Sequence, residues 1–451
     1  MTSAFRQKLT FPRVIPGLAS RLFRLPRSLC FLAACLWASS ASFLPQILIY
    51  KHAYRDERAP RGEDPPVPKI VILSNQAASM ANFWRVLIAS LRENDFEITC
   101  FAPVGDEGAG KLEKLGASIE YYPLDRKGLN PFKDARTYIS LKKLFKKIKP
   151  DFLFVTTIKP VIYGCVAAGA SGVPCVFAAI TGLGYAFEAD SPLKKALNIV
   201  VQLLYRYSLK RASGVFFQNR DDLELFRSRK ILSPNANVFI VPGTGVDTER
   251  FAPAPLPAVK EGPKFLVIAR LLEAKGLWEY FEATKILKKK YPGATFSILG
   301  QEERGPGSIP VAVVKEWAND GVIYEGATED ARPYIQASDV VVLPSWREGL
   351  PTVLMEAAAM GRPIIAADAP GSREIVRNSV NGFLCEVKNP VSLATAMERF
   401  ILEPELIAPM GKKGREIVEK EFDAKKVAAF LIDAMRRSCG KASGLNTATD
   451  E

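Results

Sequence analysis

Short apolar runs alternate with amphipathic segments along most of the chain. The runs that predict strands in the first half are 69–73, 96–103, 151–155 and 174–178. The segments with helical spacing between them are 83–92 and 137–147. This alternation is typical of parallel sheets that are covered by helices, so we expect an α/β fold.

A second series of the same kind follows a stretch rich in Gly and Pro at 241–253. Its expected strands are 265–270, 296–300, 322–324, 340–343 and 363–367. We therefore predict two Rossmann-like domains whose sheets face each other across a cleft, with ligands at the carboxyl ends of the strands. The expected divisions are an N-terminal segment and linker at 1–68, domains at 69–245 and 246–437, and a tail at 438–451.

Two glutamates follow the apolar run at 340–343. Pro351 suits the first turn of a helix and Gly361 suits its end. Glu348 is then expected on a tight loop and Glu356 inside a short helix. The start of that helix would offer free N–H groups to a phosphate. Two acids beside a phosphate site make sense if they accept hydrogen bonds from hydroxyls of sugars attached to that phosphate.

Two basic residues are expected at the same sheet edge. Arg270 ends the run at 265–270, and Lys275 follows five residues later. Two fixed cations there would stabilise the charge that develops as a diphosphate leaves, each by roughly 3 kcal/mol. Paired acids are also found in glycosidases, but those enzymes have no need of a phosphate clamp.

The residue types limit the chemistry that the chain can perform. The single histidine, His52, lies outside the expected domains, which excludes a Ser-His-Asp triad and a His-rich zinc site. A DxD metal–nucleotide motif is missing as well. The seven cysteines include no CxxC pair, and those in the domains stand in apolar surroundings, as reduced, buried cysteines of cytosolic proteins do. Any chemistry must therefore use carboxylates, Lys, Arg, Tyr, hydroxyl groups and the backbone.

Positive charge gathers in the N-terminal half. Residues 69–245 carry 24 Lys and Arg against 15 Asp and Glu, whereas residues 246–451 carry 27 against 29. The basic clusters are Lys142, Lys143, Lys146, Lys147 and Lys149, and then Lys194, Lys195, Arg206, Lys210 and Arg211. They are either solvated helix faces or contacts with an anionic membrane surface. No nucleic-acid motif accompanies them, so no nucleic-acid partner is expected.

The N-terminal segment has an uncharged stretch at 28–50 that is long enough to span a bilayer. Its preceding basic residues would place the domains outside the cytoplasm, which conflicts with a cytosolic nucleotide substrate. Three interpretations stay open: an interfacial or re-entrant anchor, a cleaved targeting segment, or an extension from a misassigned start. In each case residues 56–68 act as a linker.

The donor-side residues resemble those of glycosyltransferase family 4, the retaining enzymes with the GT-B fold. The resemblance covers about residues 69–437. It implies that Arg270 and Lys275 hold the donor diphosphate and act in catalysis with Glu348. Glu348 would contact the transferred sugar, and Glu356 would accept from the ribose hydroxyls. The positions implied to bind phosphate or sugar oxygens, or to border the base, are Gly349, Leu350, Pro351 and Thr352, then Gly300 and Gly326. No metal and no cofactor are implied.

The N-terminal half resembles a bacterial subgroup that adds hexosamine-type sugars to polyprenyl-diphosphate-linked intermediates of surface glycans. The segments that carry this resemblance are 127–131, 149–151, 157–160, 163–164 and 181–187. On the acceptor side it implies Lys159, Gly182, Gly184 and Tyr185, with Lys159 able to meet the acceptor diphosphate and the glycines allowing close backbone approach. The alternative is a simple turn and a surface lysine.

Two departures from the family leave acceptor activation open. Many members have a Gly-Gly loop after the first strand, where this chain has Ser-Asn-Gln-Ala-Ala-Ser at 74–79. Many place a histidine near the donor sugar, where the loop at 181–187 is expected here.

Taken together, these features predict a retaining, metal-independent transferase that moves a hexosamine from a UDP-sugar to a lipid-diphosphate-linked glycan. The acceptor would attack from the face that the diphosphate leaves. We expect a cytoplasmic protein, peripheral or N-terminally anchored at the cytoplasmic face of the inner membrane. The rivals are a nucleotide-sugar epimerase of the same fold and a catalytically inactive, membrane-associated assembly factor.

Overall fold

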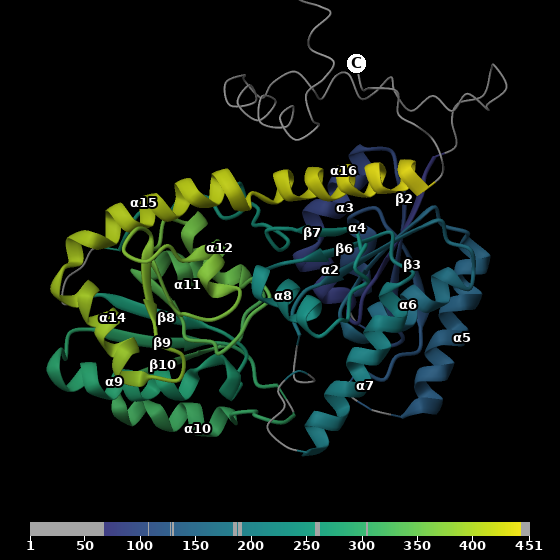
Figure 1. The fold of residues 1–451 in the computed structure, drawn as a ribbon. Coiled ribbons are helices and arrows are strands. Elements are labelled where there is room, and N and C mark those ends of the chain that lie inside the picture. Colours follow the sequence, from purple (N-terminus) through teal and green to yellow (C-terminus); the bar gives the residue numbers. More distant parts are fainter. Residues whose placement is uncertain are drawn as a thin grey trace, which may run out of the picture. The chain divides into compact units, whose positions relative to one another are not determined.

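The computed structural model describes residues 67–442, apart from residues 107, 127, 129, 184–186, 188–191, 258–261 and 304. The described residues form two parallel sheets flanked by helices (Figure 1). The first sheet has the strand order β3-β2-β1-β4-β5-β6-β7, and the second has the order β10-β9-β8-β11-β12-β13. This is the expected α/β architecture with two Rossmann-like halves.

The strands of the first sheet are β1 (Lys69–Leu73), β2 (Glu97–Pro103), β3 (Ser118–Tyr122), β4 (Phe152–Thr156), β5 (Cys175–Ile180), β6 (Gly214–Phe217) and β7 (Val238–Ile240). Those of the second sheet are β8 (Lys264–Ile268), β9 (Thr295–Leu299), β10 (Val322–Gly326), β11 (Val340–Leu343), β12 (Ile364–Ala367) and β13 (Gly382–Cys385). Every residue of β4, β5, β11 and β12 is buried. Helices therefore cover both faces of the central strands, which explains their continuous apolar runs.

The helices of the first half are α2 (Ala77–Phe83), α3 (Arg85–Glu93), α4 (Ala109–Lys114), α5 (Pro131–Ile148), α6 (Ile158–Gly169), α7 (Pro192–Leu209) and α8 (Arg220–Ser228). Those of the second half are α9 (Leu277–Lys290), α10 (Val311–Glu316), α11 (Arg332–Ala337), α12 (Thr352–Ala359), α13 (Ser372–Ile375), α14 (Pro390–Leu402), α15 (Ile407–Ile417) and α16 (Ala424–Ala442).

The nine strands predicted from apolar runs are confirmed within one or two residues, and β3, β6, β7 and β13 were missed. Strands β3, β7 and β13 lie at the edges of their sheets, where only one neighbour is paired. Edge strands are less buried, and β3 reads Ser-Ile-Glu-Tyr-Tyr with a single buried residue. Strand β6 lies inside the sheet but has only four residues. Weak or short apolar runs of this kind give little signal in a sequence.

The last helix, α16, returns to the first half of the chain. It lies beside α3 (Figure 1). Its residues Val427, Leu431 and Ile432 are buried in one cluster with side chains of β1, β4 and α3. The helix runs to Ala442, so residues 438–442 are helical where a tail was predicted from 438. Asn237 donates to the Ser438 hydroxyl at 2.9 Å, which fixes this end of the helix beside β7.

The prediction that the cysteines are reduced is wrong for one pair. The same packing brings Cys439 to Cys175 of β5, and the two form a disulfide with their Cα atoms 5.9 Å apart. Because the two residues are 264 positions apart in the chain, no sequence spacing indicates the pair. The thiols of Cys100, Cys165 and Cys385 are buried and free as expected, and burial raises the pKa of each to about 12.

Among the described residues, no helix combines the length and the apolar character needed to cross a membrane. The apolar stretch predicted at 28–50 lies outside the described residues.

A buried arginine holds the second half together behind its sheet. Arg362 is fully buried, and it donates to the carbonyls of Ala254, Pro255, Ile335, Gln336, Ser338 and Met360 at 2.8–3.2 Å. Burial lowers the pKa of its guanidinium, and Asp339 opposes this shift. The side chain therefore joins the linker after residue 253 to α11 and to the turn before β12.

We expect the substitution Arg362→Met to lower the free energy of unfolding by about 3–5 kcal/mol, because it leaves several buried carbonyls without a donor. Chemical denaturation monitored by circular dichroism would measure the change. Arg437→Met is the matched control, since Arg437 pairs with Asp433 on the surface of α16, and it should cost less than about 1 kcal/mol. Equal destabilisation by the two variants would contradict this account.

Candidate active site

The predicted donor residues lie at one edge of the second sheet. Strands β8 and β11 are hydrogen-bonded neighbours in parallel orientation, so the loops after both strands leave the sheet at the same edge. The loop after β8 contains Arg270 and a short 3₁₀ turn over Glu273–Lys275. The loop after β11 contains Glu348 and leads into α12.

An ion pair joins these two loops. The ammonium of Lys275 lies 2.5 Å from Oε1 of Glu348, and the side chains are 17% and 14% exposed. The loops can approach this closely because residue 276 is glycine: its φ is +71°, and a Cβ there would lie 2.1 Å from the carbonyl oxygen of Pro344. The backbone N–H of Trp346 also donates to the Ala274 carbonyl at 3.0 Å. The contact between the two loops thus brings one of the expected cations together with one of the expected acids.

Arg270 lies two residues beyond β8 and is directed to another partner. Its side chain is 52% exposed and forms an ion pair with Glu303 in the loop after β9. Gly300, directly after β9, allows this loop to pack closely against the loop after β8, since a Cβ at residue 300 would lie 1.7 Å from the Ala269 carbonyl oxygen. Gly300 also donates to the carbonyl of Gly326 at 2.7 Å. The predicted base-bordering residues therefore lie together, next to Arg270.

Helix α12 begins one residue later than its sequence predicts. Pro351 precedes the first turn, Thr352 is the first helical residue, and no side chain caps the helix. Among the described residues, no capping side chain therefore competes with an anionic ligand for the N–H groups of this first turn, although that of Leu354 donates to the Pro351 carbonyl at 3.2 Å. Gly349, Leu350 and Pro351 form the connection between Glu348 and this helix start, as predicted.

Glu356 lies in the second turn of α12 and is partly buried. Desolvation raises the pKa of its carboxyl to about 7, while Arg250 lowers it and Asp330 raises it further. Hydrogen bonds from hydroxyl donors would stabilise the ionised form of this carboxyl and would lower its pKa.

The loop carrying Glu348 is also held by the first half of the chain. Asn219 donates to the Gly349 carbonyl at 2.7 Å, and Arg347 forms an ion pair with Asp222. Asp222 is fully buried, and its burial raises the pKa of its carboxyl against the opposing effect of Arg347. Asn219 also caps α8, because its side chain accepts from the N–H of Asp222 at 2.7 Å. The two residues flanking Glu348 are thus tied to the start of α8.

The sequence prediction missed these contacts. The signal that was present is local: Asn219 followed by Asp221 and Asp222 is typical of a helix start. That pattern indicates α8, but it does not reveal that the cap faces a loop 130 residues further along the chain.

The predicted acceptor residues are only partly described. A Cβ at Gly182 would lie 3.6 Å from the Gly349 nitrogen, so this loop lies against the donor loop. Gly184 and Tyr185 lie outside the described residues. Lys159 is 16% exposed and donates to Asp134 and to the carbonyls of Asp125 and Gly128 at 2.7–2.9 Å. All three of its N–H groups are therefore engaged, and an acceptor phosphate would have to replace one of these partners.

Two family models match the chain. "Glycosyl transferase 4-like" matches residues 69–219, and "Glycosyl transferases group 1" matches residues 262–403. An N,N'-diacetylbacillosaminyl-diphospho-undecaprenol alpha-1,3-N-acetylgalactosaminyltransferase of Campylobacter jejuni is 28% identical over 77% of this chain and 93% of its own length. A UDP-Gal:alpha-D-GlcNAc-diphosphoundecaprenol alpha-1,3-galactosyltransferase of Escherichia coli is 28% identical over 68% of this chain and 80% of its own length.

Solved structures support the fold. Anabaena Alr3699/HepE in complex with UDP superposes with a TM-score of 0.66 and 17% identity, covering 82% of this chain and all of that one. Sucrose-phosphate synthase from Thermosynechococcus elongatus gives a TM-score of 0.68 and 18% identity, covering 82% of this chain and 98% of that one.

We expect nucleotide-sugar affinity to depend on the ionisation of Glu356. With a pKa near 7 in the free protein, the carboxyl is mostly protonated at pH 6 and must lose its proton to accept from ribose hydroxyls. The dissociation constant should therefore fall about tenfold from pH 6 to pH 8 and level off above the pKa. Isothermal titration in buffers of different ionisation enthalpy would report the released proton. The variant Glu356→Gln should show neither effect, and an unchanged pH dependence in that variant would contradict the assignment.

We expect Asn219→Ser to lower kcat by about fivefold, because the hydrogen bond to the Gly349 carbonyl is lost. The nucleotide dissociation constant should change little. Serine still caps α8, but its hydroxyl is too short to reach Gly349. Asn389→Ser is the matched control, because Asn389 caps α14 in the same manner. Steady-state kinetics and thermal melting of both variants would test this, and equal kcat values would remove the role of Asn219 in positioning the donor loop.

Proposed function

Because the chain belongs to glycosyltransferase family 4 and has the GT-B fold, we propose that it transfers a hexosamine from a UDP-sugar to a polyprenyl-diphosphate-linked glycan. The observation that carries this proposal is the Lys275–Glu348 pair at the sheet edge, beside the uncapped start of α12. This site offers a cation and helix N–H groups to a diphosphate and a carboxylate to a sugar. The acceptor class is supported by both relatives, whose names give undecaprenyl-diphosphate-linked sugars, and the UDP-sugar donor class by the name of the second, which gives UDP-Gal.

The proposed reaction exchanges one bond at the anomeric carbon for another. The bond to the leaving phosphate oxygen breaks, and the acceptor oxygen bonds to the same carbon on the same face, so the configuration is retained. The acceptor proton passes to the leaving phosphate oxygen. Lys275 stabilises the charge of the leaving diphosphate, and Arg270 would join it by exchanging Glu303 for phosphate. These side-chain cations would provide the positive charge without a metal or other cofactor.

Glu348 has a different part in the proposed site. Its pairing with Lys275 fixes one carboxylate oxygen and leaves the other able to accept from sugar hydroxyls. It also keeps the lysine ammonium in place before the donor arrives, which reduces the reorganisation needed on binding. The loop at Gly182 lies against Gly349, so an acceptor held by the first half would meet the donor sugar there.

The relatives support transfer and support neither rival. Neither an epimerase nor an inactive assembly factor would transfer a sugar to a lipid-linked acceptor. We propose that the reaction takes place at the cytoplasmic face of the inner membrane, where a cytosolic nucleotide sugar meets a lipid-linked acceptor.

We expect Lys275→Ala and Glu348→Ala to have different signatures. Loss of Lys275 should weaken nucleotide-diphosphate binding by more than tenfold and lower kcat/KM by about a hundredfold, because the leaving charge loses a buried cation. Loss of Glu348 should lower kcat by a similar factor but should preserve or tighten diphosphate binding, since Lys275 is freed from its partner. Isothermal titration with UDP and transfer assays on a polyprenyl-diphosphate sugar would measure both.

The matched controls are Lys285→Ala and Glu282→Ala, which remove an exposed Lys–Glu pair on α9. Both should leave binding and turnover within about twofold, as exposed pairs contribute little. If Glu348→Ala weakened UDP binding as much as Lys275→Ala does, the division of roles would be wrong. If no UDP-sugar were consumed in the presence of lipid-linked acceptors, the proposed function itself would fail.

A further inference from the structure

Helix α7 exposes a stripe of large apolar side chains. Ile199, Val200, Leu203 and Tyr207 are 59%, 52%, 59% and 53% exposed. At 100° per residue they fall on one side of the helix, while Val201, Tyr205 and Leu209 are buried on the other side. Single exposed apolar residues are normal, but four neighbours on one helix indicate a surface that contacts something.

Basic residues border this stripe. Lys195, Arg206 and Lys210 are exposed, and the helical spacing places them on the same side as Ile199 and Leu203. The sequence of α7 contains no acidic residue over its 18 positions. We call the apolar stripe and these three bases the α7 face.

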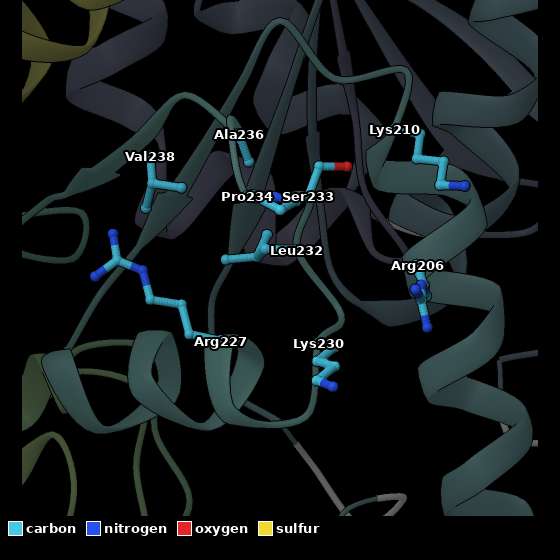
Figure 2. Close-up of a pocket in the computed structure, with 9 residues that line it drawn as sticks. All are labelled: Arg206, Lys210, Arg227, Lys230, Leu232, Ser233, Pro234, Ala236 and Val238. Carbon is cyan, nitrogen blue, oxygen red and sulfur yellow. The ribbon is translucent and has the colours of Figure 1, made fainter.

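A pocket of about 620 Å³ continues the α7 face toward α8. Figure 2 shows Arg206 of α7 and Lys210, which directly follows α7, on one side of it, with Arg227 of α8 and Lys230 of the turn after α8. The remaining residues that line it are Leu232, Ser233, Pro234, Ala236 and Val238. Four bases and no acid are thus found among the described residues around this pocket, and none of them belongs to the donor site.

The start of α7 is close in the chain to the loop at Gly182. Gly182 lies against Gly349, and α7 starts at Pro192. Ten residues of extended chain span at most about 36 Å. The start of α7 is therefore within about 36 Å of Gly182, which lies against the loop that carries Glu348.

We propose that the α7 face docks on an anionic phospholipid surface. The apolar stripe enters the boundary between headgroups and acyl chains, and the bases and the pocket take lipid phosphates. A second copy of this chain is a poorer occupant, because a two-fold contact through this face would place bases opposite bases. The inference rests on the proposed function in one respect: docking on the membrane would bring the enzyme to its lipid-linked acceptor.

The test uses the full chain and the double variant Ile199→Glu/Leu203→Glu. Its matched control is Val391→Glu/Leu402→Glu on α14, where the two side chains are 63% and 60% exposed. Co-sedimentation with vesicles of phosphatidylcholine and phosphatidylglycerol should show at least tenfold weaker binding of the α7 variant and no change for the control. Any membrane affinity of residues 1–66 is shared by both variants and does not affect the difference.

A second variant tests the charge component. Arg206→Gln/Lys210→Gln should weaken binding to phosphatidylglycerol vesicles by about tenfold or more, and binding to pure phosphatidylcholine vesicles should not change. Lys285→Gln/Lys289→Gln, two exposed lysines of α9, serve as its control.

The readouts separate this inference from the proposed function. The α7 variants should keep UDP binding and transfer to an acceptor in detergent micelles, and should lose transfer to the same acceptor in vesicles. Equal vesicle binding by the α7 variants and their controls would overturn the docking surface, as would a change of oligomeric state in the α7 variants alone. A wild-type protein that binds vesicles but transfers no sugar would instead refute the proposed function and leave the docking surface standing.

Discussion

The ion pair between Lys275 and Glu348 is the constraint on which the candidate site depends. It forms because two neighbouring parallel strands end at one edge and because Gly276 lets the second loop reach the first. Sequestering a lysine and a glutamate in this manner costs desolvation, which the pair offsets only partly. A site that binds a diphosphate recovers that cost, since the lysine then has an anion to meet and the glutamate has hydroxyls to accept from.

The same loop joins the two halves of the protein. Arg347 and Gly349, on either side of Glu348, are bound by Asp222 and Asn219 at the start of α8. Any movement of one half against the other would therefore pull on Glu348, the residue that we propose contacts the sugar. In enzymes with two domains such a connection couples closure of the cleft to assembly of the site. The contact between Gly182 and Gly349 brings the proposed acceptor loop to the same place.

The parts of this site that could be predicted from sequence are those that are local in sequence. Glu348 and Glu356 stand in one strand–loop–helix segment, and Lys275 follows a strand that the apolar pattern identifies. The partners Asn219 and Asp222 could not be predicted, because their contacts cross more than a hundred residues. The Cys175–Cys439 bond was missed for the same reason. The pairing of Arg270 with Glu303 and of Lys159 with Asp134 depends on side-chain packing, which no periodicity encodes.

Helix α7 shows a further limit of pattern analysis. Apolar residues lie on both of its sides, so its periodicity alone cannot tell which side the sheet covers. Only the fold shows that Tyr205 packs inward while Leu203 faces out. Part of the excess of bases in the first half borders this apolar stripe, as Lys195, Arg206 and Lys210 do, while the cluster at 142–149 lies on α5 and its C-terminal end. Charge and apolar surface thus coincide in the half that is proposed to receive the lipid-linked acceptor, while the proposed donor site lies in the nearly neutral second half.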